Sequence, residues 1–188
     1  MPDLDAAKQT LLTELREHSL VIGEVTLSSG AKAQYYIDAR RALLRPAGFR
    51  AAGELIAAAA TGAGADAVGG PVMAAIPLAC AAIAVPAGDG LLGFFVRTER
   101  KQHGLQRWVE GPVAPGARCL VVEDTVTTGG STAAAIERIR EEGLEVAGVL
   151  AVVDRLAGGG DAIEAVAEAP YRALVTIDEL YPDRPDRG

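Results

Sequence analysis

The residues best suited to chemistry lie in one stretch, 119–132, which reads Cys-Leu-Val-Val-Glu-Asp-Thr-Val-Thr-Thr-Gly-Gly-Ser-Thr. An apolar run of strand length ends in two adjacent carboxylates, Glu123 and Asp124, and a loop of small hydroxyl and glycine residues leads into a helical pattern. Glycines let backbone N–H groups approach a phosphate closely, and the start of a helix adds about half a positive charge. Carboxylates at the end of a strand can accept hydrogen bonds from the hydroxyls of a ribose. The stretch therefore predicts a site for a phosphorylated sugar.

The predicted phosphate contacts come from the loop after the two acids. This loop is neither a Walker loop, which needs Gly-Lys-Ser/Thr, nor a dinucleotide fingerprint, which needs G-x-G-x-x-G. An ordinary strand-to-helix turn, with Ser131 capping the helix, is the alternative interpretation. We expect the loop to contact substrate through Thr125, Thr127, Thr128, Gly129, Gly130, Ser131 and Thr132.

A second stretch whose residues could take part in chemistry, residues 97–111, is long, polar and cationic. In a chain with a formal net charge of −7, it indicates a basic loop that captures a polyanion and closes to exclude water. Its cations are Arg97, Arg100, Lys101 and Arg107, set against the acids Glu99 and Glu110. His103 can donate a proton or only a hydrogen bond, since an unperturbed histidine pKa of about 6.5 permits either. A solvated surface hairpin is the alternative interpretation.

Composition and charge argue against several other classes of protein. Apolar residues make up 49% and charged residues 23%, which opposes long disordered stretches. The negative net charge opposes a general nucleic-acid binder. Residues 51–67 include Glu54 and Asp66 and fall short of the roughly 20 apolar residues that a bilayer requires. Because residues 1–8 are polar and unlike a signal peptide, we expect a soluble cytoplasmic protein without nucleic-acid or membrane partners. Cys80 and Cys119 lie in apolar runs and are expected to be buried, reduced thiols.

The N-terminal part of the chain predicts a small hood of helix and β structure. Asp3 can cap a first helix that ends near His18, where a histidine is favourable. A β-rich stretch over residues 21–27 and a short strand over residues 35–39 follow. The apolar stripe of the helix consists of Leu4, Ala7, Leu11, Leu12 and Leu15.

After residue 46 apolar strands and helices alternate, which is typical of a parallel sheet covered on both faces. We expect strands over 67–69, 91–96, 119–122 and 146–153, and helices over 47–60, 73–83 and 131–142. The helix that begins at Ser131 should stop at Gly143. The predicted fold class is α/β, with a central, mainly parallel sheet flanked by helices. We expect one domain over residues 1–188, with a hood over about 1–45 and a core over about 46–180. The polar residues 182–188 are expected to fray.

Residues 119–132 resemble the signature of the type I phosphoribosyltransferases, an apolar strand followed by two acids and a Thr/Gly/Ser loop. The resemblance implies the fold of that family. It also implies that Glu123 and Asp124 hold the ribose hydroxyls, while Thr125 through Thr132 hold the 5′-phosphate.

Residues 97–104 resemble the catalytic loop of the orotate phosphoribosyltransferases within that family, whose pattern is Arg, Lys, Glu, any, Lys, any, His, Gly. Arg97, Glu99, Lys101, His103 and Gly104 match, and Thr98 stands where the family usually has a second lysine. The family's loop reaches into the active site of the neighbouring subunit. The resemblance therefore implies a homodimer with shared active sites.

Three further segments agree with this resemblance. Ser29, in a Ser-Gly turn, and the pair Tyr35 and Tyr36 are similar to family residues near the orotate ring, although the tyrosines could also be core aromatics. Arg155 is similar to an arginine that faces the orotate carboxylate, which suits a planar guanidinium, although a surface ion pair is the alternative. The stretch from Gly69 to Ala74, which includes Gly70, matches the family's pyrophosphate loop in position, and Ala74 replaces a lysine that many members carry.

Together these resemblances imply transfer of a phosphoribosyl group from phosphoribosyl pyrophosphate to orotate, with Mg²⁺ as the cofactor. No cysteine or serine lies in a nucleophile–base motif, so displacement at the anomeric carbon is expected, with Arg97, Lys101, His103 and Asp124 as the catalytic residues. Two alternatives stay open. One is a phosphoribosyltransferase for a purine base, and the other is a non-catalytic regulator that senses phosphoribosyl pyrophosphate.

Overall fold

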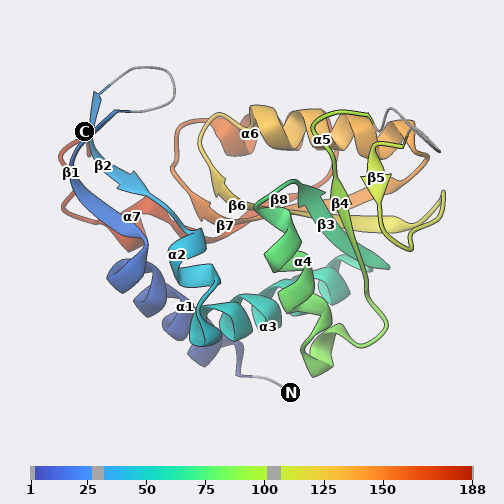
Figure 1. Cartoon of the computed structure of the whole chain (residues 1–188), viewed down its shortest axis with the longest axis horizontal. Coiled ribbons are helices and arrows are strands. Elements are labelled where there is room, and N and C mark those ends of the chain that lie inside the picture. The colour runs from blue at the N-terminus through green and yellow to red at the C-terminus, as the bar shows by residue number, and fades with distance from the viewer. Residues whose placement is uncertain (1–2, 27–31, 101–106, 188) are drawn as a thin grey trace.

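A computed structural model of the chain describes residues 3–26, 32–100 and 107–187 (Figure 1). Its main sheet has six strands in the order β5-β4-β3-β6-β7-β8. All neighbouring pairs run parallel except β5, which is antiparallel to β4. The strands are β3 (Ala67–Pro71), β4 (Leu92–Val96), β5 (Val109–Glu110), β6 (Arg118–Val126), β7 (Glu145–Asp154) and β8 (Tyr171–Thr176).

Helices cover both faces of this sheet, as the alternating sequence pattern predicts. On one face lie α1 (Leu4–His18), α3 (Pro46–Ala63) and α4 (Ala75–Ile83), and on the other lie α5 (Gly130–Glu141) and α6 (Gly159–Ala167) (Figure 1). Each face has its own cluster of buried apolar side chains. The predicted α/β fold with a mainly parallel central sheet is therefore confirmed. Short helices complete the order: α2 (Arg40–Leu43), the 3-10 turn η1 (Pro86–Gly88) and α7 (Ile177–Leu180). Among the described residues no helix combines the length and apolar character needed to cross a membrane.

The hood combines α1 with an antiparallel hairpin of β1 (Leu20–Thr26) and β2 (Lys32–Ile37). Asp3 caps α1 by accepting a hydrogen bond from the Ala6 N–H at 3.0 Å, and the helix ends at His18. The predicted stripe of α1 is buried except Leu4, which is 40% exposed.

Several sequence-based expectations need correction. Strand β6 extends to Val126 instead of stopping at residue 122, and α6, β8, β5 and the short helices α2 and α7 were not predicted. Cys80 is an exposed thiol, because it lies on the outer side of α4, whereas Cys119 is buried as expected. The segment 182–188 was expected to fray, but its described residues, 182–187, are held by contacts, because Arg184 pairs with Asp178 of α7.

A close approach of two helices fixes how α3 and α4 cover the sheet. An added Cβ at Gly53 of α3 would overlap the carbonyl oxygen of Ala81 in α4. Gly62, in the same helix, has no atom within 4 Å of the position that its Cβ would take. The close crossing of α3 and α4 therefore requires a glycine at position 53. It does not require one at position 62.

This contrast predicts opposite effects for two glycine-to-alanine substitutions in one helix. Gly53→Ala should lower the free energy of unfolding by about 1–3 kcal/mol, because the helices must move apart. Gly62→Ala should raise it by about 0.5 kcal/mol, because alanine restricts the unfolded chain and suits a helix. Chemical denaturation of both variants measures the difference. Equal values would contradict the close crossing.

Candidate functional site

The candidate site lies where the strand order of the sheet reverses. After β3 the chain passes to β4 on one side, and it later returns to β6 on the other side of β3. In open α/β sheets ligands bind in the crevice outside the carboxyl ends of strands at such a switch point. A cavity of about 320 Å³ opens there, and its walls come from the hood as well as from the ends of β3, β6 and β7. Its lining residues are Tyr36, Ile37, Asp38, Arg40, Met73, Ala74, Asp124, Thr125, Thr127 and Arg155.

The loop after β6 forms a second hollow beside this cavity. Residues Thr125 through Thr132 line it, and its volume is about 170 Å³. Gly129 caps α5 with a φ of +79°, and a Cβ there would lie 2.8 Å from the Gly159 carbonyl oxygen. Gly130 faces open space, with no atom within 4 Å of the position that its Cβ would take. The loop thus presents the backbone at the start of α5 to the hollow, an arrangement suited to an anion.

The two acids of the signature point in different directions. Asp124 lines the cavity, whereas Glu123 is 5% exposed and turns under the loop. The Glu123 Oε2 accepts hydrogen bonds from the Ser131 hydroxyl at 3.1 Å and the Thr132 hydroxyl at 3.0 Å. Neighbouring residues of a strand face opposite sides, and β6 continues through both acids. Had the strand been predicted to continue, alternation would have separated the two roles.

Burial raises the pKa of both carboxyl groups. Burial, with a smaller contribution from the Asp124 charge, raises the pKa of Glu123 from 4.5 to about 7, and the two hydroxyl donors lower it only in part. Burial also raises the pKa of Asp124, against the lowering effect of a backbone N–H and of Arg40. A proton is therefore easily held at Glu123 near neutral pH.

One hydroxyl of the site has no hydrogen-bond partner in the part of the chain that the structure describes. The Thr125 Oγ1 is buried without a hydrogen bond among the described residues, and Thr125 lines both hollows. Buried polar atoms are normally satisfied, so an orphan at this place indicates a ligand or water partner.

The hood contributes an ion pair that sequence reasoning missed. The Arg40 Nε donates to the Asp38 Oδ1 at 2.8 Å, and this hydrogen bond raises the pKa of Arg40. Both side chains line the cavity. Asp38 lies two residues after the predicted tyrosine pair, but nothing in the local pattern marks Arg40 as a site residue.

Only one of the two predicted tyrosines lines the cavity. Tyr36 is 37% exposed and lies in its wall, whereas Tyr35 is 3% exposed and belongs to the core cluster. Arg155 lines the cavity, and its Nη2 lies 3.4 Å from the Tyr35 hydroxyl. Its Nε is buried without a hydrogen-bond partner in the described chain.

The predicted pyrophosphate loop falls partly in the cavity. Ala74 lies in its wall, and the preceding Val72–Met73 peptide bond is cis. Gly70 is buried inside β3, where a Cβ would overlap the carbonyl oxygen of Val122. Gly70 thus permits close packing of β3 against β6.

Arg97 does not line the main cavity. It borders a separate hollow of about 230 Å³ with Val72, and its Nη1 lies 3.6 Å from the Glu110 Oε1. Lys101, His103 and Gly104, like Ser29, lie outside the described residues.

The chain on both sides of residues 101–106 is fastened to α5. The Trp108 indole N–H donates to the Glu141 Oε2 at 2.8 Å, and Arg100 also binds that oxygen, at 2.9 Å. Arg138 donates to the Arg97 carbonyl at 3.0 Å, and its guanidinium carbon lies 4.5 Å from the centre of the Trp108 ring. Helix α5 begins at the loop that lines the second hollow, and its C-terminal part holds Arg97, Arg100 and Trp108.

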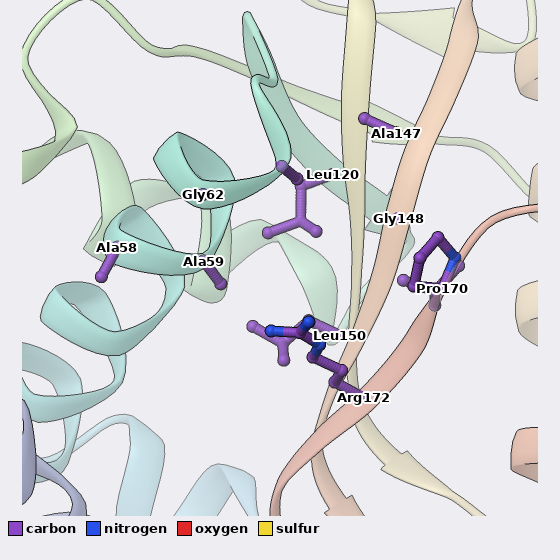
Figure 2. A pocket seen from close by; sticks show the side chains of 11 residues that line it. Ala58, Ala59, Gly62, Leu120, Ala147, Gly148, Leu150, Pro170 and Arg172 are labelled. Atoms are coloured by element: carbon purple, nitrogen blue, oxygen red, sulfur yellow. The ribbon is translucent and has the colours of Figure 1, made fainter.

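A further hollow, of about 220 Å³, lies at the opposite, amino ends of β6, β7 and β8 (Figure 2). Small and apolar residues from α3 and these strands form most of its wall, with Arg172 as the charged side chain. None of the residues predicted for the site lines it.

Comparison with known proteins agrees with this geometry. Residues 41–168 match the family model of the phosphoribosyl transferase domain. An orotate phosphoribosyltransferase of Streptomyces avermitilis is 45% identical over 179 residues, which cover 94% of this chain and 98% of that protein. The chain belongs to the orotate phosphoribosyltransferase family.

Solved members of the orotate phosphoribosyltransferase family share the fold. The Mycobacterium tuberculosis enzyme in complex with Fe(III) dicitrate superposes with a TM-score of 0.84 at 40% identity, covering 93% of this chain and 99% of that one. The same enzyme in complex with phosphoribosyl pyrophosphate gives a TM-score of 0.80 at 36% identity, covering 93% and 98%.

The raised pKa of Glu123 predicts a pH-dependent gain in stability for Glu123→Gln. Because the folded pKa is above the unfolded one, wild type loses stability as the pH rises from about 4.5 to about 7, and the loss persists at higher pH. The neutral glutamine has no such loss. The variant's free energy of unfolding, relative to wild type, should therefore be about 2 kcal/mol more favourable at pH 8 than at pH 5.

Denaturant unfolding at both pH values measures this effect. Glu164→Gln, at an exposed position of α6, is the control and should show no such trend. A pH-independent difference for Glu123→Gln would mean that Glu123 is ionised in the folded protein throughout this range.

Proposed function

We propose that the protein transfers the 5-phosphoribosyl group of phosphoribosyl pyrophosphate to orotate, giving orotidine 5′-monophosphate and pyrophosphate in pyrimidine biosynthesis. The observation that carries the proposal is the cavity at the β3–β6 switch point, which contains Asp124 and adjoins the loop that opens α5. A sugar phosphate fits a cavity with a carboxylate beside a loop that presents backbone N–H groups. Its hydroxyls and its phosphate need these different partners a short distance apart. The reaction itself is inferred from membership of the orotate phosphoribosyltransferase family.

Each wall of the cavity suits one part of the reactants. The loop from Thr125 to Thr132 takes the 5′-phosphate through backbone N–H groups and the free hydroxyl of Thr125. Asp124 accepts hydrogen bonds from the ribose hydroxyls. On the opposite side Arg155 binds the orotate carboxylate, and Tyr36 lies beside the ring.

The reaction is a displacement at the anomeric carbon of the ribose. The bond to pyrophosphate breaks while a ring nitrogen of orotate forms the new bond, and positive charge develops on the sugar. Catalysis consists of holding two anions in line and stabilising the departing charge. The pyrophosphate is bound by the backbone near Ala74 and by the side chains of Arg97, Lys101 and His103.

Mg²⁺ belongs to the proposal as an ion that enters with phosphoribosyl pyrophosphate. Within residues 3–26, 32–100 and 107–187 no group of three or more His, Cys, Asp or Glu side chains could hold a metal. Asp38 and Asp124 line the same cavity, and Mg²⁺ is commonly held by one or two carboxylates together with substrate phosphates. The ion would neutralise charge on the leaving pyrophosphate.

A homodimer with shared active sites and a cytoplasmic location complete the proposal. The position of Arg97 supports the dimer, because within one chain its guanidinium pairs with Glu110 and lies outside the main cavity. A neighbouring subunit could supply this segment, as the family's loop does.

Two substitutions test the assigned roles through the rate of orotate consumption. Asp124→Asn and Lys101→Ala should each lower kcat by about 100-fold, because they remove a contact to the ribose and to the leaving pyrophosphate. Phosphoribosyl pyrophosphate should still bind to Lys101→Ala, as calorimetry would measure. Lys8→Ala on α1 controls for loss of a surface lysine. An unchanged rate in Lys101→Ala would remove that residue from the mechanism.

A panel of bases tests the substrate. With phosphoribosyl pyrophosphate and Mg²⁺, orotate should give a nucleotide, and adenine, guanine and hypoxanthine should give none, because Arg155 requires an anionic partner. Chromatography of the products measures this. Turnover of a purine without orotate would favour the purine alternative. Ligand binding without product from any base would favour the regulator.

A further inference from the structure

We propose that the segment from Tyr181 to Arg187 is part of the base-binding side of the site. In this proposal Asp186 acts through the hydroxyl of Tyr35 to position the guanidinium of Arg155. The inference rests on the proposed function, because it takes Arg155 as the partner of the orotate carboxylate. Asp186 and Tyr35 are positioning residues, since neither lines the cavity.

The segment is held in place by its own ion pairs. Arg184 pairs with Asp178 of α7, and its Nε lies 3.1 Å from the Asp186 Oδ1. Arg187 donates to the Pro182 carbonyl at 2.7 Å. The Arg184 side chain is only 12% exposed, so its two ion pairs are partly shielded from solvent on the arginine side. One oxygen of Asp186 is thus fixed by Arg184, and the other is directed toward the hood.

That second oxygen orients a buried phenol. The Tyr35 hydroxyl donates to the Asp186 Oδ2 at 3.0 Å, and the Tyr181 ring packs edge-on against the Tyr35 ring with a centroid distance of 5.5 Å. A phenol has one proton to donate. Once Asp186 accepts it, the lone pairs of the Tyr35 oxygen are left to face other donors.

Arg155 is the donor that they face. Its Nη2 lies 3.4 Å from the Tyr35 oxygen, a long hydrogen bond, and its guanidinium carbon lies 5.4 Å from the centre of the Tyr35 ring, within the range of a cation–π contact. Two weak contacts from one rigid, buried ring orient the guanidinium toward the cavity.

The phenol between Asp186 and Arg155 also keeps the carboxylate of Asp186 from pairing directly with the guanidinium of Arg155. No carboxylate pairs with Arg155 among the described residues, and its neighbour Asp154 uses its oxygens on the Tyr171 hydroxyl and the Leu156 N–H. A carboxylate bound directly to Arg155 would compete with an anionic substrate. A relay through a neutral phenol fixes the position of the guanidinium without neutralising it.

Steady-state kinetics of Asp186→Ala tests the relay. The KM for orotate should rise about 3- to 10-fold, while the KM for phosphoribosyl pyrophosphate and kcat stay within about twofold, because only the contact to the carboxylate is loosened. Tyr35→Phe should act in the same way, and the double variant should be no worse than either single one. Asp186→Asn keeps an acceptor oxygen and should lie closer to wild type.

Asp183→Ala is the matched control, because Asp183 lies in the same segment and none of the contacts above involves it. If Asp186→Ala and Asp183→Ala have the same KM for orotate, the relay is wrong while the proposed function stands. If Asp186→Ala lowers kcat, raises both KM values to a similar extent and lowers the melting temperature, Asp186 has a purely structural role. That outcome would also overturn the relay. Absence of product from orotate in the wild type would instead refute the proposed function itself.

Discussion

A buried carboxyl group ties the last residues of β6 to the first turn of α5. Glu123 accepts hydrogen bonds from both Ser131 and Thr132, and the loop between them has little freedom once these bonds form. The tie holds the loop in the shape that leaves the backbone at Gly130 exposed. Burying an ionisable group for this purpose is costly, and the same burial raises the pKa of Glu123.

The same strand that buries Glu123 directs Asp124 into the cavity. Strand alternation places one of these two chemically similar neighbours under the loop and the other in the wall of the cavity. The hood then closes the opposite wall with Tyr36, Asp38 and Arg40. Residues distant in sequence thus meet at one switch point in the sheet.

Local patterns in the sequence were sufficient to predict the fold class and the helix limits at His18 and Gly143. They also predicted a loop between the two acids and α5, and its phosphate-binding role stays a prediction. They were insufficient where the outcome depends on contacts between distant segments. Tyr35 and Asp186 are an example, since no local pattern predicts a hydrogen bond between residues so far apart in the sequence. The expectation that residues 182–188 fray was wrong for the described residues 182–187 for the same reason, because polar side chains there bind α7 and the hood. The different directions of Glu123 and Asp124 were missed because β6 was predicted too short.

Trp108 is the one tryptophan of the sequence, and it lies against the guanidinium groups of Arg100 and Arg138. Indole emission responds to nearby charges, so a shift of residues 97–100 against α5 changes the environment of this single chromophore. The protein therefore contains its own optical reporter at the base of the cationic segment. Its fluorescence reads the geometry there without any attached label.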